Sequence, residues 1–466
     1  MAGSATEIRV VERSAVSPLP RTVAATSLPL TFLDISWLPF PPGQTLFFFN
    51  IPNSTSHFMQ AILPNLKHSL SLTLHHFFPL SGRLATPRHP AVPRLEYGAD
   101  DSIFLTIAEA VSGDFKNLGG YHPRMAQDFH KLMPLLQSST KFGSKHESLL
   151  AIQITVFPHH GICIGFTLRH VVADGRTFNN FLKTWAAASS SPLTKNGESL
   201  GLNQLLVASH DRSLIKDPNG LEEILLKEWR SIQIPQNASL SKFHPDMTRA
   251  TFVVGPNEME KIKKWILTRS EHLFGSTQLL LSPYVITCAF VWVCWMKTHW
   301  SNSIEHHPKE STHYFGFIAG GITRLNYSVP STYSGNCVGF GRSEARRDNL
   351  MDENGVLHAA KAIGNTIKRL NSDLLGGAEK WISEWEEMRD SELHVMVTGS
   401  PKMDLYGLDF GWGRPIKIEE VSIDETRSIS LCESREMSGG VEIGVCLPKP
   451  KLELFWTLFN QGLKRD

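Results

Sequence analysis

Residues 149–185 read LLAIQITVFPHHGICIGFTLRHVVADGRTFNNFLKTW, and the pattern of apolar side chains changes within this stretch. Residues 149–157 and 161–168 form two apolar runs of strand length, and the Pro-His-His-Gly segment between them predicts a β-hairpin. From Asp174 or Gly175 onward the pattern predicts a helix, because apolar side chains recur at helical spacing at Phe178, Phe181, Leu182 and Trp185. The hairpin therefore leads directly into a helix, through a short segment that contains His170.

Strands and helices also alternate in the rest of the chain. Before the hairpin, residues 46–49 read as a buried strand, and residues 58–74 carry an apolar helical face. Beyond it we expect strands at 247–254, 416–421, 428–433 and 440–447, and helices at 256–267, 283–297 and 451–462. This mixture is typical of the α/β class.

The length of the chain predicts two domains. At 466 residues it exceeds what one ordinary hydrophobic core organises, so we expect two domains of roughly 200 residues each. The segment from Ala186 to Pro192 is rich in Ala and Ser, and a polar segment follows it, which favours a linker. We predict an N-terminal domain at 1–190, a crossover linker at 191–220 and a C-terminal domain at 221–466.

The composition excludes some classes of partner. Hydrophobic residues make up 41% of the chain and charged residues 20%, as in ordinary globular proteins. Forty-six Lys and Arg residues balance 45 Asp and Glu residues, so a nucleic-acid partner is not expected. The six cysteines are scattered without a Cys-x-x-Cys pair, which favours free thiols in a reducing compartment.

No targeting or membrane segment is evident. The N-terminus carries charges at Glu7, Arg9, Glu12 and Arg13 and has no apolar signal region. The longest apolar stretch, Val285 to Met296, is too short to span a bilayer. We therefore expect a cytosolic protein without a membrane partner.

His170 and Asp174 form a His-x-x-x-Asp pattern at the end of an apolar strand, where side chains reach a cleft more readily than a core. An imidazole titrates near neutral pH and suits proton abstraction from an alcohol. The alternatives are a solvated structural histidine and an Asp174 that only caps the following helix. His159 and His160 lie nearby, but no third ligand has a recognisable spacing, so no metal is expected.

Asp409-Phe-Gly-Trp-Gly413 is the second candidate for chemistry. Gly411 and Gly413 allow backbone conformations that residues with side chains resist. The indole N–H of Trp412 is a hydrogen-bond donor that could stabilise an oxyanion. The alternative is a tight turn packed around a tryptophan.

The two patterns together, in this order and about 235 residues apart, resemble the BAHD family of plant acyl-CoA-dependent acyltransferases. Nearly the whole chain takes part in the resemblance. Four further segments resemble the anthocyanin and phenolic-glucoside branch: Leu28-Pro-Leu-Thr-Phe-Leu-Asp34, His76-Phe-Phe-Pro-Leu-Ser-Gly82, Tyr333-Ser-Gly-Asn-Cys337 and Ser430-Leu-Cys-Glu-Ser434.

The resemblance implies an α/β fold of two chloramphenicol-acetyltransferase-like domains. Each domain has a mixed β-sheet with flanking helices, and an active-site channel runs between them. Acyl-CoA and the acceptor enter from opposite mouths, and His170 is the base for direct attack on the thioester, without an acyl-enzyme. Trp412 is the implied oxyanion donor, and Asp409 supports its own loop as a weaker catalytic candidate. Asp174 points away from the channel and pairs with an arginine.

Two departures from the family pattern affect these expectations. Family members carry Arg-x-Arg where this chain has Gly320-Gly-Ile-Thr-Arg-Leu325, so Arg324 is the expected partner of Asp174. The branch has Phe where this chain has Ser334, and we expect the surrounding side chains to repack.

Two segments are candidates for binding CoA. Ser282 and Pro283 open an apolar helix as N-cap and first residue, and the exposed N–H groups there could bind a phosphate or simply be capped. Ser400, Pro401 and Lys402 precede the Trp412 loop and supply a cation, and the resemblance also implies CoA contacts there. No bound cofactor is expected, since acyl-CoA is a co-substrate.

The implied reaction is transfer of a malonyl group to a sugar hydroxyl of a phenolic, flavonoid or anthocyanin glycoside. A malonyl carboxylate needs a cation, and Arg176 is a candidate, unless it lies on the outer face of its helix. Alternatives are a hydroxycinnamoyl donor, an amine acceptor and a catalytically silent homologue that binds phenolics. A peptide-synthetase condensation domain is less compatible, because Arg169 replaces the first His of its motif. We expect a monomer.

Overall fold

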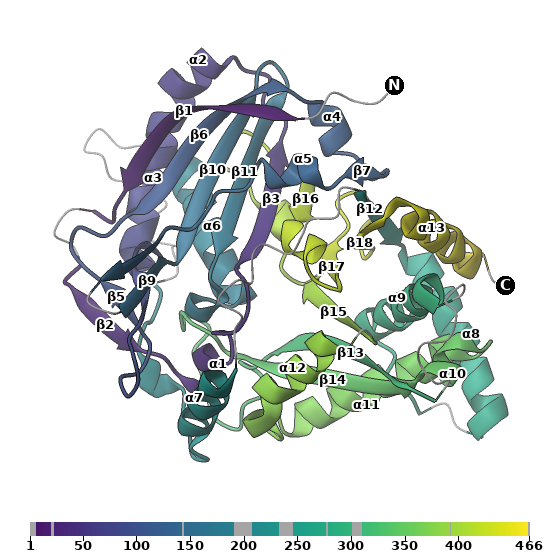
Figure 1. Ribbon diagram of the computed structural model, residues 1–466. Coiled ribbons are helices and arrows are strands. Elements are labelled where there is room, and N and C mark those ends of the chain that lie inside the picture. The colour runs from purple at the N-terminus through teal and green to yellow at the C-terminus, as the bar shows by residue number, and fades with distance from the viewer. Residues whose placement is uncertain are drawn as a thin grey trace.

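The computed structural model describes residues 6–19, 23–141, 144–190, 207–232, 246–275, 278–300, 310–391 and 393–464. Within these ranges the chain forms three β-sheets with helices against them, which confirms the expected mixed α/β class. Figure 1 shows the N-terminal half, in purple and blue, beside the C-terminal half, in green and yellow.

The first sheet contains the predicted hairpin at its centre. In the described residues it has six strands, in the spatial order β1 (Glu7–Val16), β6 (Ile103–Ser112), β10 (Leu150–Phe157), β11 (Gly161–Leu168), β3 (Gly43–Phe49) and β16 (Lys417–Glu420). Every residue of β10 and β11 is buried, which explains their continuous apolar sequence. The hairpin is antiparallel, with Leu150 opposite Leu168.

The second sheet belongs mainly to the C-terminal half. Its described strands lie in the order β14 (Val338–Arg346), β13 (Thr312–Gly320), β15 (His394–Gly399), β17 (Ser428–Glu433), β18 (Val441–Pro448), β12 (Met247–Val254) and β7 (Arg124–Met125). A smaller sheet in the N-terminal half orders β2 (Thr26–Pro29), β5 (Arg94–Tyr97), β4 (Arg83–Thr86), β9 (Ser144–Ser148) and β8 (Ser138–Lys141).

The two halves exchange edge strands. β16, from the C-terminal half, pairs with β3, and β7, from the N-terminal half, pairs with β12. Figure 1 shows β16 beside β3 and β7 beside β12. Buried charges join the exchanged strands, because Glu419 of β16 accepts hydrogen bonds from Arg124 of β7 and from Arg249 of β12. Each sheet is therefore completed by a strand from the other half.

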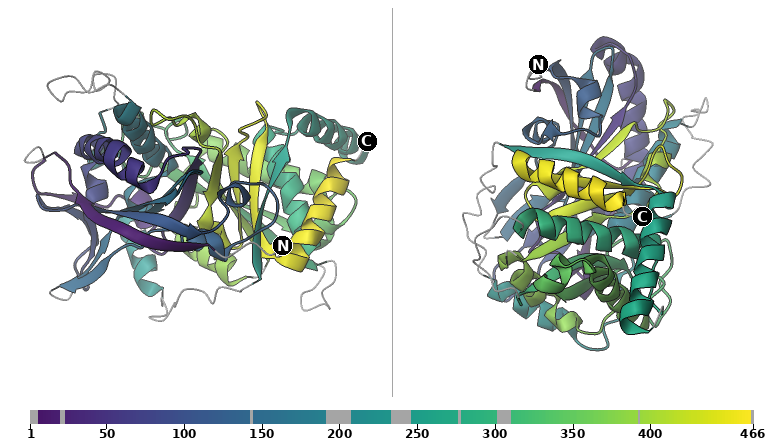
Figure 2. Two further views of the ribbon diagram at one scale, coloured as in Figure 1. Left: turned by 90° about the horizontal axis from the view of Figure 1, so that it is seen from above. Right: turned by 90° about the vertical axis from the view of Figure 1, so that its right-hand side faces the viewer.

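Helices complete both halves. In the N-terminal half, α3 (Leu63–His76) packs against α6 (Gly175–Ser190). In the C-terminal half, α9 (Pro283–Trp300) packs against α11 (Gly355–Ser372) and α13 (Lys449–Leu463), with α8 (Pro256–Phe274) beside α9. Figure 2 shows α13, in yellow, lying along the second sheet close to the C-terminus. α9 is apolar around its whole circumference because it is covered on all sides.

Most sequence-based elements are confirmed. The helix predicted after the hairpin begins at Gly175, and the strand at 247–254 and the helix that opens at Pro283 have the expected starts. Residues 191–206 of the predicted linker lie outside the described residues, and the division of the chain at 190 and 220 stays a prediction.

All six cysteines lie in the described ranges and are free thiols, as expected. In those ranges, none of the helices has the length and apolar character needed to cross a membrane.

Candidate active site

His170 lies where the two halves of the chain meet. It follows the end of β11 and begins a single 3-10 turn, η3 (His170–Val172), before α6. The loop Tyr333–Cys337, from the C-terminal half, packs against this turn, and Asn336 contacts the imidazole. His170 keeps partial exposure, whereas its neighbours Val171 and Val172 are buried. The side chain is therefore held between two distant parts of the sequence.

The hydrogen bonds of Asn336 determine which nitrogen of His170 carries the proton. The amide Nδ2 of Asn336 donates to Oδ1 of Asp34 at 2.9 Å and to the carbonyl of His170 at 2.9 Å. Its Oδ1 therefore faces Nδ1 of His170, at 3.1 Å, as an acceptor. Nδ1 must carry the hydrogen in the neutral ring. Nε2 then has the free lone pair that a general base requires.

Asp34 fixes the orientation of Asn336. It is fully buried in α1 (Phe32–Ile35), and its Oδ2 accepts from both the backbone N–H and the hydroxyl of Thr31. The guanidinium of Arg212 lies 3.6 Å from the same oxygen and balances its charge. An ionised carboxylate only accepts hydrogen bonds, so the NH₂ group of the Asn336 amide, and not its oxygen, must face Asp34.

Trp37 covers one face of the imidazole. The two ring centroids are 3.4 Å apart and the planes differ by 17°, which is a parallel stack. Phe40 lies against Trp37, and Trp385 lies against Phe40, so an aromatic group extends away from His170. Burial lowers the pKa of His170 to about 4, and the nearby charge of Asp174 opposes part of that shift. The ring is therefore neutral at physiological pH.

This lowered pKa predicts the pH dependence of activity. Because the base form persists down to about pH 4, the acid limb of kcat/KM that reports His170 should lie near pH 4 instead of near 6.5. Between pH 6.5 and 4 the unfolded chain binds a proton that the folded protein does not, so folding stability should fall as pH falls. A profile of kcat/KM from pH 4 to 8 checks this, and a limb near 6.5 that disappears in a His170 variant contradicts it.

Asp174 holds the loop that carries Asn336. It is buried, and its Oδ1 accepts from the backbone N–H of Thr177 at 2.7 Å, which caps α6. Its Oδ2 accepts from the backbone N–H of Cys337 at 3.0 Å. Thr177 donates its hydroxyl to the carbonyl of Gly335 at 2.9 Å. Asp174 is therefore both helix cap and loop anchor, the two non-catalytic roles expected for it.

The predicted pairing of Asp174 with Arg324 is wrong. Arg324 donates instead to Oδ1 of Asn371 and to the carbonyl of Gly320, four residues away. The cation near Asp174 is Arg176, at 3.8 Å. Arg176 also donates to the carbonyls of Ser331 and Tyr333, at 2.8 and 2.7 Å. Arg176 therefore turns toward the 331–333 segment and does not extend outward from α6, and its binding of an acyl carboxylate stays a prediction.

The predicted role of Trp412 as oxyanion donor at His170 is also wrong. Its ring packs edge-on against Phe49, and Phe49 pairs with Ile162 at the end of β11 that is opposite Leu168 and His170. Six residues of strand separate those ends by roughly 20 Å. The length of α6 also places Trp412 far from His170. The helix starts beside His170 and runs about 22 Å to Ser190, which lies against Gly411.

The Asp409–Gly413 segment is a structural turn in this protein. Asp409 is exposed, and its Oδ1 accepts from the backbone N–H groups of Gly411 and Gly413 at 2.8 and 2.9 Å. Both glycines have positive φ, of 100° and 102°, as their position in the pattern suggested. Trp412 stacks on Phe410 and closes the far end of the first sheet. The expected support of its own loop by Asp409 is observed, and a catalytic role for it is not supported.

Cys337 is the thiol closest to this network. It is buried, and burial together with the charge of Asp174 raises its pKa to about 12. A thiol that stays protonated is a poor nucleophile. The arrangement therefore favours direct attack on a thioester over an acyl-enzyme at Cys337.

The predicted CoA-binding segments lie in two places. Ser282 accepts from the N–H of Val285 at 3.3 Å, so it caps α9 as expected, and Pro283 is the first residue of that helix. Ser400–Lys402 form a turn after β15, and the turn contacts α6 because Asn179 donates to the carbonyl of Met403. Lys402 is exposed. CoA binding at both segments stays a prediction.

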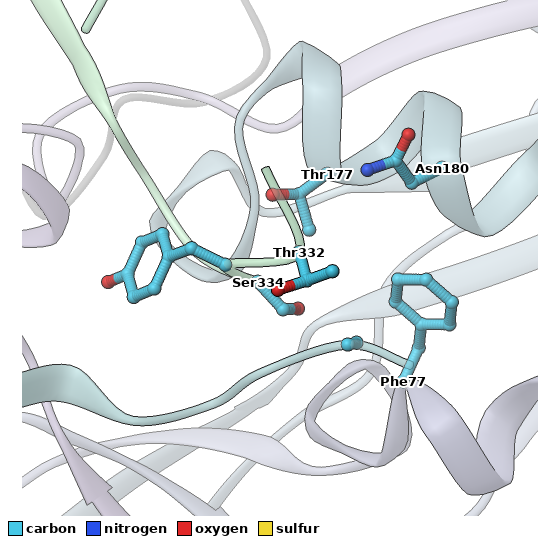
Figure 3. A pocket seen from close by; sticks show the side chains of 7 residues that line it. Phe77, Thr177, Asn180, Thr332 and Ser334 are labelled. Carbon is cyan, nitrogen blue, oxygen red and sulfur yellow. The ribbon is translucent and has the colours of Figure 1, made fainter. Parts of the chain in front are cut away.

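A small cavity adjoins Ser334 (Figure 3). It is lined by Phe77, Thr177, Asn180, Ala208, Thr332, Tyr333 and Ser334. Figure 3 shows Thr177 and Asn180 on one helix, α6, with Phe77 on a separate segment below them. Ser334 is itself buried, and the space beside it holds no more than about one water molecule, so the expected repacking around the smaller side chain stays a prediction.

Trp37, Asn336 and Asp34 are the site residues that the sequence did not identify. Asn336 and Asp34 lie in two segments that resemble the family, Tyr333–Cys337 and Leu28–Asp34, but neither had a role. Trp37 lies three residues beyond the second segment.

In the described part of the chain, no group of three or more His, Cys, Asp or Glu side chains could hold a metal ion.

Comparison with known proteins supplies the wider context. Residues 6–461 match the Transferase family. "Coumaroyl-CoA:anthocyanidin 3-O-glucoside-6''-O-coumaroyltransferase 2" of Arabidopsis thaliana is 38% identical, covering 100% of this chain and 99% of its own length. "Malonyl-coenzyme A:anthocyanin 3-O-glucoside-6''-O-malonyltransferase" of Dahlia pinnata is 35% identical, covering 98% of both. Among solved structures, vinorine synthase aligns with a TM-score of 0.67 over 96% of both chains at 17% identity, which is a likeness of fold.

Proposed function

The chain belongs to the Transferase family, the BAHD acyltransferases, and we propose that it transfers an acyl group from acyl-CoA to a sugar hydroxyl of a phenolic or anthocyanin glycoside. The observation that carries the proposal is the neutral His170 with its Nε2 lone pair free. The full-length relatives supply the class of donor and acceptor. Family membership also speaks against a peptide-synthetase condensation domain.

The geometry supports a direct transfer. Nε2 of His170 takes the proton of the acceptor hydroxyl while its oxygen bonds to the thioester carbon. The resulting tetrahedral species collapses as the carbon–sulfur bond breaks. The imidazolium, which Asn336 orients through Nδ1, then returns the proton to the CoA thiolate. Asp174 takes no part in the proton transfer and maintains the loop that positions Asn336.

Turnover assays test the function. The purified protein is incubated with p-coumaroyl-CoA or malonyl-CoA and a panel of phenolic and anthocyanidin glucosides, and CoA release and product mass are measured. We expect one acyl group to be added to a sugar for each CoA released. CoA release without an acylated glycoside, or no turnover with any donor, contradicts the proposal.

Two acyl donors have specific support. Malonyl-CoA, the donor expected from the sequence, is supported by the Dahlia relative, and a hydroxycinnamoyl-CoA is supported by the Arabidopsis relative. One observation favours the hydroxycinnamoyl group: the aromatic side chains Trp37, Phe40 and Trp385 pack one against the next beside His170, and aromatic surroundings suit a phenyl ring.

Replacing Arg176 tests whether it recognises a malonyl group. Because its guanidinium binds the carbonyls of the 331–333 segment, we expect Arg176→Ala to lower kcat/KM about equally for malonyl-CoA and coumaroyl-CoA, by roughly threefold to tenfold. Lys183→Ala, on the same helix and paired with Asp404, is the matched control. A loss confined to malonyl-CoA would instead identify Arg176 as the carboxylate partner.

The proposed setting is the cytosol, and the proposed active form is a monomer. Free thiols at all six cysteines are compatible with a reducing compartment. Both parts of the site, the His170 turn and the Asn336 loop, come from one chain.

A further inference from the structure

The N–H of Trp37 is a buried donor beside the base. The indole stacks face to face on His170, with 3.4 Å between the ring centroids. Its Nε1 is inaccessible to solvent and has no hydrogen-bond partner among the described residues. Buried polar groups normally find a partner, so an unpaired donor in contact with a catalytic base points to a partner that arrives with the substrate.

The proposed reaction lacks a donor for its developing negative charge. Attack on the thioester places charge on the carbonyl oxygen, and acyltransferases stabilise such an oxygen with preorganised N–H groups. Trp412 also has a buried, unpartnered N–H, but it lies roughly 20 Å from His170 along the strands of the first sheet. Trp37 is the described indole that contacts the base.

We propose that the indole N–H of Trp37 donates a hydrogen bond to the thioester carbonyl oxygen in the transition state. This role rests on the proposed acyl transfer. In that step His170 binds the attacking oxygen and Trp37 binds the carbonyl oxygen, and both oxygens are attached to one carbon. Two groups on adjacent stacked rings can each come within about 3 Å of a common reacting centre. The hydrogen bond holds the negative charge until the carbon–sulfur bond breaks and the CoA thiolate takes the proton from His170.

Because the Trp37 N–H has no partner among the described residues of the free protein, its effect on catalysis can be measured apart from the effect of the ring on stability. Removing a donor that has no partner in the free protein removes no hydrogen bond from the folded state. A variant that keeps the ring and loses only the N–H should therefore keep its thermal stability. If the N–H serves catalysis, the same variant loses transition-state stabilisation, and kcat falls while the KM for acyl-CoA stays nearly constant.

The experiment replaces Trp37 with 3-benzothienylalanine, in which sulfur takes the place of the indole N–H, and in parallel makes Trp37→Phe. Both keep an aromatic face against His170. We expect kcat to fall roughly 10²-fold in each, with an unchanged acid limb of the pH profile. The benzothienyl variant should keep its melting temperature, whereas Trp37→Phe also loses ring volume and should melt at a lower temperature. The matched control is 3-benzothienylalanine at Trp412, an equally buried and unpartnered N–H, for which kcat should stay within about twofold.

Different results would contradict the proposed acyl transfer and the proposed role of Trp37. A wild-type protein that transfers no acyl group overturns the proposed function, and the role of Trp37 with it. An active wild type whose Trp37 variants keep kcat within about threefold overturns the oxyanion role alone. A shift of the acid limb together with a loss of kcat also overturns it, because Trp37 would then act by tuning His170. If Trp37→Phe fails to fold, the benzothienyl variant, which preserves ring volume, decides.

Discussion

Replacing His170 with alanine is expected to lower kcat by roughly 10³- to 10⁴-fold, because the general base of the transfer is lost. The KM for acyl-CoA should change little, since the imidazole acts on the acceptor hydroxyl and on the leaving thiolate. Folding should persist, because the His170 side chain keeps partial exposure and, among the described residues, has one side-chain hydrogen-bond partner, Asn336. Steady-state kinetics with a saturating glucoside and circular dichroism provide the two measurements.

His160→Ala is the matched control for this substitution. His160 is exposed in the hairpin turn at the other end of β11, and its Nδ1 contacts only the local carbonyl of Pro158 among the described residues. Its loss should leave kcat unchanged. Comparable rates in the His170→Ala variant and the wild-type protein would show that another group removes the proton, and would contradict the proposed mechanism.

Substitution of Asn336 by alanine is expected to lower kcat by about 10³-fold while the base itself remains. Without the Oδ1 acceptor, Nδ1 of His170 is no longer required to carry the hydrogen, and part of the population places it on Nε2, where it blocks proton abstraction. The ring also loses its orientation. Asp34 loses the side-chain donor of Asn336 and keeps the backbone N–H of residue 336, so we expect folding to be weakened by about 1–3 kcal/mol as well.

The tautomer can be observed directly. In ¹⁵N-histidine-labelled protein, His170 should show a protonated Nδ1 and an unprotonated Nε2 in the wild type, and a mixed state in Asn336→Ala. Asn179→Ala serves as control, because Asn179 bonds the Ser400–Met403 turn without touching His170. A variant that loses stability yet keeps kcat would reduce Asn336 to a structural residue.

The part of the fold that depends on local pattern was predictable. The apolar runs at 150–157 and 161–168 are central strands buried on both faces, and the helical spacing after Gly175 marks a helix with one buried face. The position of His170 at the end of the second strand follows from that local pattern alone. Its chemistry could therefore be anticipated before any tertiary contact was known.

The relation between His170 and Trp412 was not predictable in this way. Both lie near strands of one sheet, and their joint occurrence suggests a shared site. Since β3 is antiparallel to β11, however, Phe49 and the Trp412 ring against it belong to the opposite end from His170. Strand direction is set by the long connections between strands, about which local periodicity says nothing.

The groups that orient the base could not be predicted either, because they lie far apart in the sequence. Asp34, His170 and Asn336 meet although 136 residues separate the first pair and 166 the second. Neither an aspartate in a four-residue helix nor an asparagine in a glycine loop has a local pattern that reveals such a contact. For the same reason the sequence could not show that Arg324 does not contact Asp174. The partners of Arg324, Asn371 and Gly320, lie within its own half of the chain.

The exchange of β16 and β7 constrains how the enzyme can move. A hinge motion that separated the halves would have to break the pairing of β16 with β3 and the buried contacts of Glu419 with Arg124 and Arg249. Ion pairs buried in this way are costly to break. We therefore expect the two halves to stay joined during catalysis, with local movements of loops and side chains admitting the two substrates.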